Sequence, residues 1–187
     1  ALWYSTLTVT GGTWSYGTAS LSGGGLRAYD STLELSDLQA EQNSAGSEGG
    51  ALAVFEGTVD IDDGTFRDNY SWAHGGAVYL DHVQSSSLTD STFRRNTSYW
   101  ADGGSIAIFD GSLAVSHHIA DCLITDSDAV NGGGLGWYSD AAASQSTLTI
   151  KDTTFRRNGA FTGGGLRAEN GDILLVEGST FEKNDSW

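Results

Sequence analysis

Gly75-Gly76-Ala77-Val78 and Phe93-Arg94-Arg95-Asn96 are the stretches that decide the fold, because relatives of both recur along the whole chain. The glycine signature returns at Gly23-Gly24-Gly25-Leu26, Gly49-Gly50-Ala51-Leu52, Gly103-Gly104-Ser105-Ile106, Gly132-Gly133-Gly134-Leu135 and Gly163-Gly164-Gly165-Leu166. Successive copies start 26, 26, 28, 29 and 31 residues apart. A period of this length indicates one structural unit stacked on copies of itself, and it is too long for a heptad or collagen repeat.

The second signature alternates with the first. It recurs at Phe66-Arg67-Asp68-Asn69, Phe155-Arg156-Arg157-Asn158 and Phe181-Glu182-Lys183-Asn184, and weaker forms fall at residues 14–17, 40–43 and 123–126. Short runs of alternating polar and apolar residues occur at 6–9, 32–35, 58–61, 112–115 and 147–150. Alternation with period two predicts strands, and no window has helical periodicity.

A repeat made only of strands buries its apolar side by winding into a coil that stacks on the next one. We therefore expect an all-β chain folded as a right-handed parallel β-helix of about seven coils, a rod on the order of 30 Å tall. The rows expected to face inward are Leu26/Ala28, Leu52/Val54, Val78/Leu80, Ile106/Ile108, Leu135/Trp137 and Leu166/Ala168, together with Trp14, Phe66, Phe93, Leu123, Phe155 and Phe181.

The composition bears on which partners the surface can bind. The formal net charge is −15, which disfavours nucleic acid and anionic lipid as partners. No apolar run is long enough to span a membrane, so no direct membrane insertion is expected. Neither an EF-hand loop nor a calcium-binding nonapeptide array occurs, so no metal or other cofactor is expected. Cys122 is the lone cysteine; we expect a shielded structural thiol in the row of Thr92 and Thr154.

The chain is expected to be one β-helix segment, residues 1–187, of a longer repeat protein. Ala1-Leu2 aligns with Ala51-Leu52, and residues 184–187 align with residues 69–72. Both ends then fall in mid-coil, where a solenoid would otherwise place caps.

The two alternating motifs resemble the polymorphic outer membrane protein repeat of chlamydial autotransporter adhesins, which also occurs in large secreted proteins of other bacteria, algae and protists. Gly75-Gly76-Ala77-Val78 and Phe93-Arg94-Arg95-Asn96 match best, and residues 14–17, 40–43 and 123–126 depart from the second motif. The resemblance extends over residues 1–184. It implies a right-handed β-helix on a cell surface, with an adhesive or structural role, but it names no ligand.

One polar row has two interpretations. Stacking the coils puts six residues on a line, where side-chain amides can bond to one another and to the turns: Asn43, Asn69, Asn96, Asp126, Asn158 and Asn184. The alternative is N-glycosylation, because Asn69, Asn96 and Asn184 each begin an Asn-x-Ser/Thr sequon.

Catalysis is the main alternative to a structural role, because β-helices include polysaccharide lyases and hydrolases. Such an enzyme needs clustered carboxylates or a basic group. The candidates are Asp60, Asp62 and Asp63 in one acidic turn, and His117-His118 with Asp121 in a loop that only one coil carries. Ice binding would need a continuous Thr-x-Thr row, which the chain lacks. We expect no enzymatic activity.

The outward positions after the glycines carry an aromatic row: Tyr29, Phe55, Tyr79, Phe109 and Tyr138. Exposed aromatic residues at strand spacing typically mark an interaction surface. The alternative is that a loop, such as the insertion at residues 139–145, covers them. The sequence therefore favours a non-catalytic segment of an extracellular, cell-surface fibre, coat or adhesin. Its partners would be other copies of itself, a receptor protein or a glycan.

Overall fold

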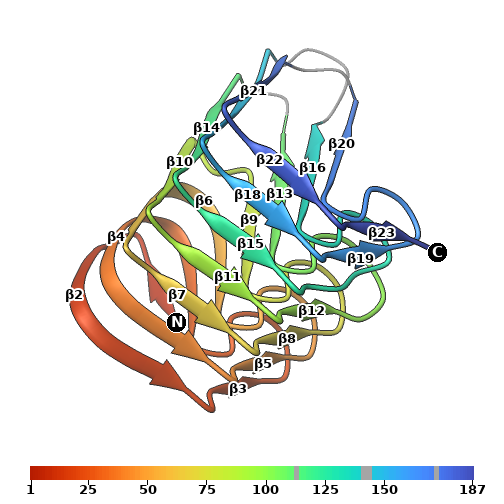
Figure 1. Cartoon of the computed structure of the whole chain (residues 1–187). Helices are drawn as coiled ribbons and strands as arrows, with labels where there is room; N and C mark the ends of the chain where they lie inside the picture. The colour runs from red at the N-terminus through yellow and green to blue at the C-terminus, as the bar shows by residue number, and fades with distance from the viewer. Residues whose placement is uncertain (112–113, 140–144, 171–172) are drawn as a thin grey trace.

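The computed structural model describes residues 1–111, 114–139, 145–170 and 173–187. Within these residues all regular structure is strand, and none of them forms a helix capable of crossing a membrane. The chain winds into a parallel β-solenoid of about seven turns, which confirms the predicted all-β stack of coils. Figure 1 shows the coils stacked in chain order from the red N-terminal end to the blue C-terminal end.

Each coil contributes one strand to each of three long faces. The first face, after the glycine pair, contains β1 (Leu2–Trp3), β9 (Val78–Asp81), β13 (Ile106–Asp110), β16 (Leu135–Ser139) and β20 (Leu166–Glu169). The second contains β10 (Ser85–Thr89), β14 (Ser116–Ala120), β17 (Thr147–Lys151) and β21 (Ile173–Glu177). The third contains β7 (Thr65–Arg67), β11 (Thr92–Arg94), β15 (Leu123–Thr125), β18 (Thr154–Arg156) and β22 (Thr180–Glu182), which lie side by side in Figure 1.

Three longer strands bend from face to face in the N-terminal coils: β2 (Thr6–Ser15), β4 (Leu26–Glu41) and β6 (Leu52–Asp62). A corner of two-residue strands closes the coils, formed by β3 (Thr18–Ala19), β5 (Ser44–Ala45), β8 (Tyr70–Ser71), β12 (Thr97–Ser98), β19 (Gly159–Ala160) and β23 (Asp185–Ser186). In the coil of β13 to β15, Asp128 takes this place with isolated bridges to Thr97 and Gly159. Gly75 and Gly76 follow this corner. Gly75 has a φ of +63°, and a Cβ on either glycine would collide with a backbone carbonyl oxygen, so the turn requires the pair.

Parallel pairing turns every sequence position into a row that runs along the rod. Phe66 pairs with Phe93, and their rings stack in the interior with centroids 4.9 Å apart. Leu80 pairs with Ile108, and both are fully buried. The hydrophobic core is therefore a column of like residues, as the alternation predicts.

A row of aspartates forms the turn between the second and third faces. Five of them, each with φ between +46° and +54°, occupy successive coils: Asp37, Asp63, Asp90, Asp121 and Asp152. Asp is one of the few non-glycine residues that tolerate this conformation. We refer to them as the turn aspartate row.

The coil of β13, β14 and β15 corrects three predictions. Ile124, not Leu123, pairs with Phe93 and enters the core, while Leu123 lies beside Thr92 and is 38% exposed. Cys122 consequently lies one row before Thr92. Asp126 lies in the outer turn with a φ of +57°, and its predicted place in the polar row belongs to Ser127. The cause is the position of the turn: in each of the five coils with a turn aspartate, the core residue lies three positions after it, and Asp121 therefore places it at residue 124.

Two further alignments were wrong. The run at 112–115 is not the strand of the second face, because β14 pairs with β10 at that position; residues 112 and 113 lie outside the described residues. At the N-terminus Leu2 pairs with Ala28 rather than with the row of Leu52, which brings Trp3 beside Tyr29.

Candidate interaction surfaces

The predicted aromatic residues lie on the outside of the first face and form two groups of ring contacts, which meet where Tyr29 pairs with Phe55 in the strand register. The ring centroids of Phe55 and Tyr79 lie 5.6 Å apart, as do those of Tyr79 and Phe109, and Phe109 stacks on Tyr138 at 4.9 Å. Tyr29 contacts Trp3 at 5.0 Å, a member that the sequence alignment missed. We call these six residues the outer aromatic ladder.

The ladder faces away from the core but is only partly open to solvent. Phe55, Tyr79 and Phe109 form a second apolar cluster with Ala53 and Ala107, separate from the interior column. Tyr79 is 8% exposed. Burial, reinforced by nearby Asp81, raises the pKa of its hydroxyl. The rings therefore cover one another along the rod, while residues 140–144, which include most of the loop suggested as a cover, lie outside the described residues.

A second group of aromatic side chains lies at the corner of β8 and β12, and sequence reasoning missed it. Trp72 packs edge-on against Tyr99 at 5.1 Å and stacks with Trp100 at 6.5 Å, and Tyr70 joins them. Trp100 is 66% exposed. The signal in the sequence was an aromatic residue three positions after the Asn of two successive coils. We call Tyr70, Trp72, Tyr99 and Trp100 the corner aromatic cluster.

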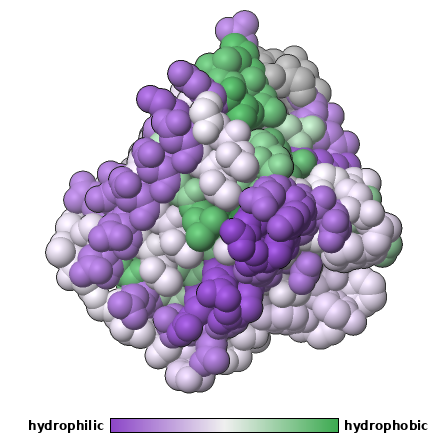
Figure 2. Space-filling model, viewed as in Figure 1, coloured by the Kyte–Doolittle hydropathy of each residue, from purple (hydrophilic) through white to green (hydrophobic). Residues whose placement is uncertain are grey.

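Six of the nine basic residues line the edge between the third face and that corner. They are Arg67, Arg94, Arg95, Arg156, Arg157 and Lys183, and we call them the arginine strip. Figure 2 shows a strongly hydrophilic patch on the near face, where the third-face strands end in Figure 1. In a chain of net charge −15, this concentration is the main cationic feature.

Acidic residues in the same rows neutralise part of the strip. Arg95 bonds both oxygens of Asp68, at 2.7 and 2.8 Å, and Arg157 bonds both oxygens of Asp126, at 2.5 and 2.8 Å. These hydrogen bonds lower the pKa of both carboxyl groups below the usual value. Arg67 pairs with Glu41 at 2.7 Å.

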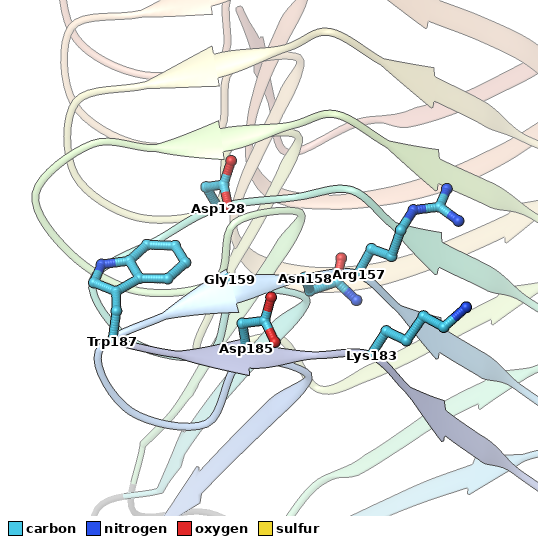
Figure 3. Close-up of a pocket in the computed structure, with 7 residues that line it drawn as sticks. All are labelled: Asp128, Arg157, Asn158, Gly159, Lys183, Asp185 and Trp187. Atoms are coloured by element: carbon cyan, nitrogen blue, oxygen red, sulfur yellow. The ribbon is translucent and has the colours of Figure 1, made fainter.

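A hollow of about 470 Å³ lies where the strip meets the last corner strands. In Figure 3, Asp128 and Asp185 lie on either side of Gly159, Arg157 and Lys183 point to one side, and Trp187 lies on the other. Because Gly159 has no side chain, the Trp187 ring and the Asp128 carboxylate approach its backbone more closely than a Cβ would allow. Burial, with a smaller effect of nearby Asp126, raises the pKa of Asp128.

The polar row is a hydrogen-bonded ladder inside the rod. The Oδ1 of each Asn accepts from the backbone N–H of the Asn one coil earlier, at 3.0 Å from Asn43 to Asn69 and from Asn69 to Asn96. Its Nδ2 donates to a carbonyl of the preceding coil, as from Asn69 to Ala40 at 2.8 Å. Asn158 and Asn184 repeat the pattern.

At Ser127 the ladder changes its chemistry. The shorter side chain accepts from the N–H of Asn96, and Ser105 fills the remaining gap: Asn96 Nδ2 donates to Ser105 Oγ at 3.2 Å, and the two serine hydroxyls lie 2.8 Å apart. The sequence signal was Ser105 itself, because the other glycine signatures carry Gly or Ala there.

The sequons at Asn69, Asn96 and Asn184 use the same side chains. Asn69 and Asn96 are buried, and the Nδ2 of each already donates two hydrogen bonds in the interior. A glycan on either Nδ2 would have to replace those bonds. Asn184 donates to Phe155 at 2.9 Å in the same manner but is partly exposed.

The histidine candidates lie in different places from those expected. His117 is on β14, not in a loop, and is 1% exposed; its Nε2 lies 2.7 Å from Asp110 Oδ1, and its Nδ1 lies 2.8 Å from Ser86 Oγ. The other oxygen of Asp110 accepts from the indole of Trp137 at 2.7 Å. Ser86, His117 and Asp110 match a hydrolase triad in type only, because all three are buried in the rod.

The acidic candidates are not gathered into one site either. Asp60 and Asp62 lie on the outer side of β6, where Asp62 accepts from Thr89 at 2.7 Å. Asp63 and Asp121 belong to the turn aspartate row, in different coils. Among the described residues, no group of three or more His, Cys, Asp or Glu side chains is arranged to hold a metal ion.

Comparisons with known proteins add no name to this geometry. No family model matches the chain, and neither does any curated protein or solved structure. The outer aromatic ladder, the corner aromatic cluster and the arginine strip are therefore the features that bear on function.

Proposed function

We propose that the chain is a non-catalytic, extracellular β-solenoid segment of a cell-surface fibre, coat or adhesin, whose rod presents side chains for attachment or assembly. The observation that supports this most is the outer aromatic ladder, six aromatic side chains outside the core in two groups of ring contacts. The core does not require it, since the interior column is complete without it.

The repeat explains how such a surface is built. Each outward position becomes a linear array because each coil adds one side chain about 4.8 Å further along the rod. Partly exposed aromatic rings in such an array bury large area in a contact at low entropy cost. Copies of this chain, a receptor protein or a glycan are the partner classes that such a surface serves.

The test replaces two ladder rings and compares them with a matched exposed apolar side chain. Phe55→Ser with Phe109→Ser is the ladder variant, and Leu175→Ser, at an exposed position on the second face, is the control. Circular dichroism checks that each variant keeps its strand signal. The proposal expects the ladder variant to lose self-assembly or adhesion to cells while the control retains it; equal behaviour of both variants would contradict the assignment.

The hollow of Figure 3 supports a second function, cleavage of a polysaccharide. Two carboxylates, Asp128 and Asp185, line this hollow together with Trp187, and the pKa of Asp128 is raised, as an acid catalyst needs. Screening neutral and acidic polysaccharides for cleavage tests it. Turnover that Asp128→Asn abolishes, and that Asp62→Asn leaves intact, would favour the enzyme.

A further inference from the structure

The arginine strip is interrupted at one coil, and the interruption forms a groove. On the third face Arg94 pairs with Thr125, and Thr125 pairs with Arg156, so the two arginines stand two coils apart with a short side chain between them. The groove holds about 370 Å³, with Thr92 and Leu123 further along its floor. Two strand spacings separate the arginine backbones by roughly 10 Å, a distance that long side chains can close from both sides.

The guanidinium groups over this groove are the least neutralised of the strip. Arg95 and Arg157 are each held by two hydrogen bonds to a carboxylate. Arg94, in contrast, reaches Asp126 only at 3.7 Å, and that carboxylate is already occupied by Arg157. Within the described part of the chain, the Arg156 side chain makes no hydrogen bond or ion pair. Arg94 and Arg156 therefore keep free donors, which suit the planar or tetrahedral oxygens of an acidic group.

The charge of the remaining surface restricts where a polyanion can be held. The strip and its six acidic neighbours, Glu41, Asp68, Asp126, Asp128, Glu182 and Asp185, leave three basic and 18 acidic residues for the rest of the chain. At physiological ionic strength, charges further than about 8 Å are largely screened. The groove is lined by three arginines and one carboxylate, Asp126, so positive charge is in excess there and outweighs the distant repulsion. An acidic ligand is then held along the strip and repelled from the other faces.

The corner aromatic cluster favours a sugar polymer as that ligand. Arg95 and Trp100 lie on the same coil, five positions apart, across the two-residue strand β12. Exposed Trp and Tyr rings pack against the apolar faces of sugar rings, a contact that an acidic peptide does not need. The guanidinium groups thus suit the acidic groups of an acidic polysaccharide, and the aromatic rings on the same coils suit its sugar rings.

We propose that the arginine strip binds an acidic polysaccharide along the rod, with Arg94 and Arg156 holding one carboxylate or sulfate over Thr125 and the corner aromatic cluster contacting the sugar rings. This inference rests on the proposed attachment function and specifies the ligand class for one surface. Carboxylate and sulfate groups both offer the oxygen acceptors that the groove would bind, so the experiment tests a carboxylated and a sulfated polymer separately.

The experiment measures binding of the whole chain to immobilised heparin and to immobilised polygalacturonate, with dextran as the neutral polymer. The variants are Arg156→Gln and the double change Arg94→Gln with Arg156→Gln. Lys151→Gln is the control, because it removes the same charge from an exposed position outside the strip. Each arginine change is expected to raise the dissociation constant roughly tenfold, as for loss of a charged hydrogen bond, with no effect of Lys151→Gln and no binding to dextran. Added salt is expected to weaken binding of the unmodified chain.

A second variant tests the sugar contact. Trp100→Ser keeps every charge of the strip, so it is expected to weaken binding to both polymers without changing their order. Equal losses for Lys151→Gln and Arg156→Gln would overturn the proposal, and so would failure of the unmodified chain to bind either polyanion. A change in oligomeric state of the double variant, with polymer binding intact, would assign the strip to contact between copies instead. Adhesion that persists without polyanion binding, and that the Phe55 and Phe109 changes remove, would end this inference while leaving the proposed function standing.

Discussion

Asn69→Ala tests whether the interior ladder holds the coils together. The Asn69 side chain makes four hydrogen bonds: its Nδ2 donates to Ala40 at 2.8 Å and to Asn96 at 3.1 Å, and its Oδ1 accepts from the N–H and the Nδ2 of Asn43 at 3.0 and 3.1 Å. The alanine variant deprives two buried backbone groups, the Ala40 carbonyl and the Asn43 N–H, of these partners. At about 1–3 kcal/mol for each buried group left unpaired, the expected loss for the two groups is about 2–6 kcal/mol.

The assay is urea unfolding followed by circular dichroism, with the unfolding free energy extrapolated to water. Asn69→Ser is the graded comparison, because a serine hydroxyl retains part of the bonding, as Ser127 does. The coil of Ser127 further predicts a rescue. Ala51 occupies, relative to Asn43 and Asn69, the position that Ser105 has relative to Asn96 and Ser127, so adding Ala51→Ser is expected to restore part of the stability that Asn69→Ser removes.

Two results would refute this reasoning. A loss below about 1 kcal/mol for Asn69→Ala would show that water or backbone adjustment replaces the ladder bonds. A double serine variant no more stable than Asn69→Ser alone would show that the Ser105 bridge does not compensate for a short side chain. Asn43→Ala is not a substitute for this test, because its neighbour Gly17 lies near the exposed end of the rod.

Three further outcomes are expected. Asp90→Asn should stabilise the rod by about 0.5 kcal/mol in urea unfolding, because it removes one of a row of like charges while Asn keeps the positive φ; Asp90→Val should destabilise it by about 1–2 kcal/mol. Asp68 and Asp126 have lowered pKa values when folded, so their stabilisation is present above the ordinary carboxyl pKa near 4 and is lost as pH falls through the folded values. The thermal unfolding temperature should therefore decrease as the pH falls below about 4, and this decrease should be less steep in Arg157→Gln. Burial raises the pKa of the Cys122 thiol to about 11, so a thiol reagent at pH 8 should label it slowly when folded and rapidly in urea; fast labelling of the folded chain would contradict its placement.

The coils and their inward rows could be predicted because period and alternation are properties of the sequence. Val54, Leu80 and Ile108 are fully buried, as expected from their place two residues after the first aliphatic residue of each signature. The phase of a coil is harder to predict when its motif is missing. Leu123 was placed one residue early because no Phe-x-x-Asn motif marked that coil, whereas the turn aspartate Asp121, read with Asp90, would have fixed it.

The outward surfaces were less predictable, because side chains on the outside contact residues of neighbouring rows as well as those of their own row. The outward direction of Phe55 and Phe109 follows from alternation, but their contact with Tyr79 crosses from one row to the next and depends on rotamers. The arginine strip could have been found: Arg67, Arg94 and Arg156 follow the core Phe in three coils, and stacking alone aligns them.

Departures from the repeat distinguish packing from function. Inside the rod, two polar residues that depart from the repeat have hydrogen-bonding partners that also depart from it: Ser127 contacts Ser105, and His117 contacts Asp110. Such pairs are required because a buried polar group without a hydrogen-bond partner lowers the stability of the folded state. Thr125 interrupts the arginine strip on the outside, and its hydroxyl donates only to the adjacent Asp126 at 3.1 Å. Since core packing does not demand this gap, and the arginines on either side keep free donors, the gap is better explained by what the strip binds than by how the rod folds.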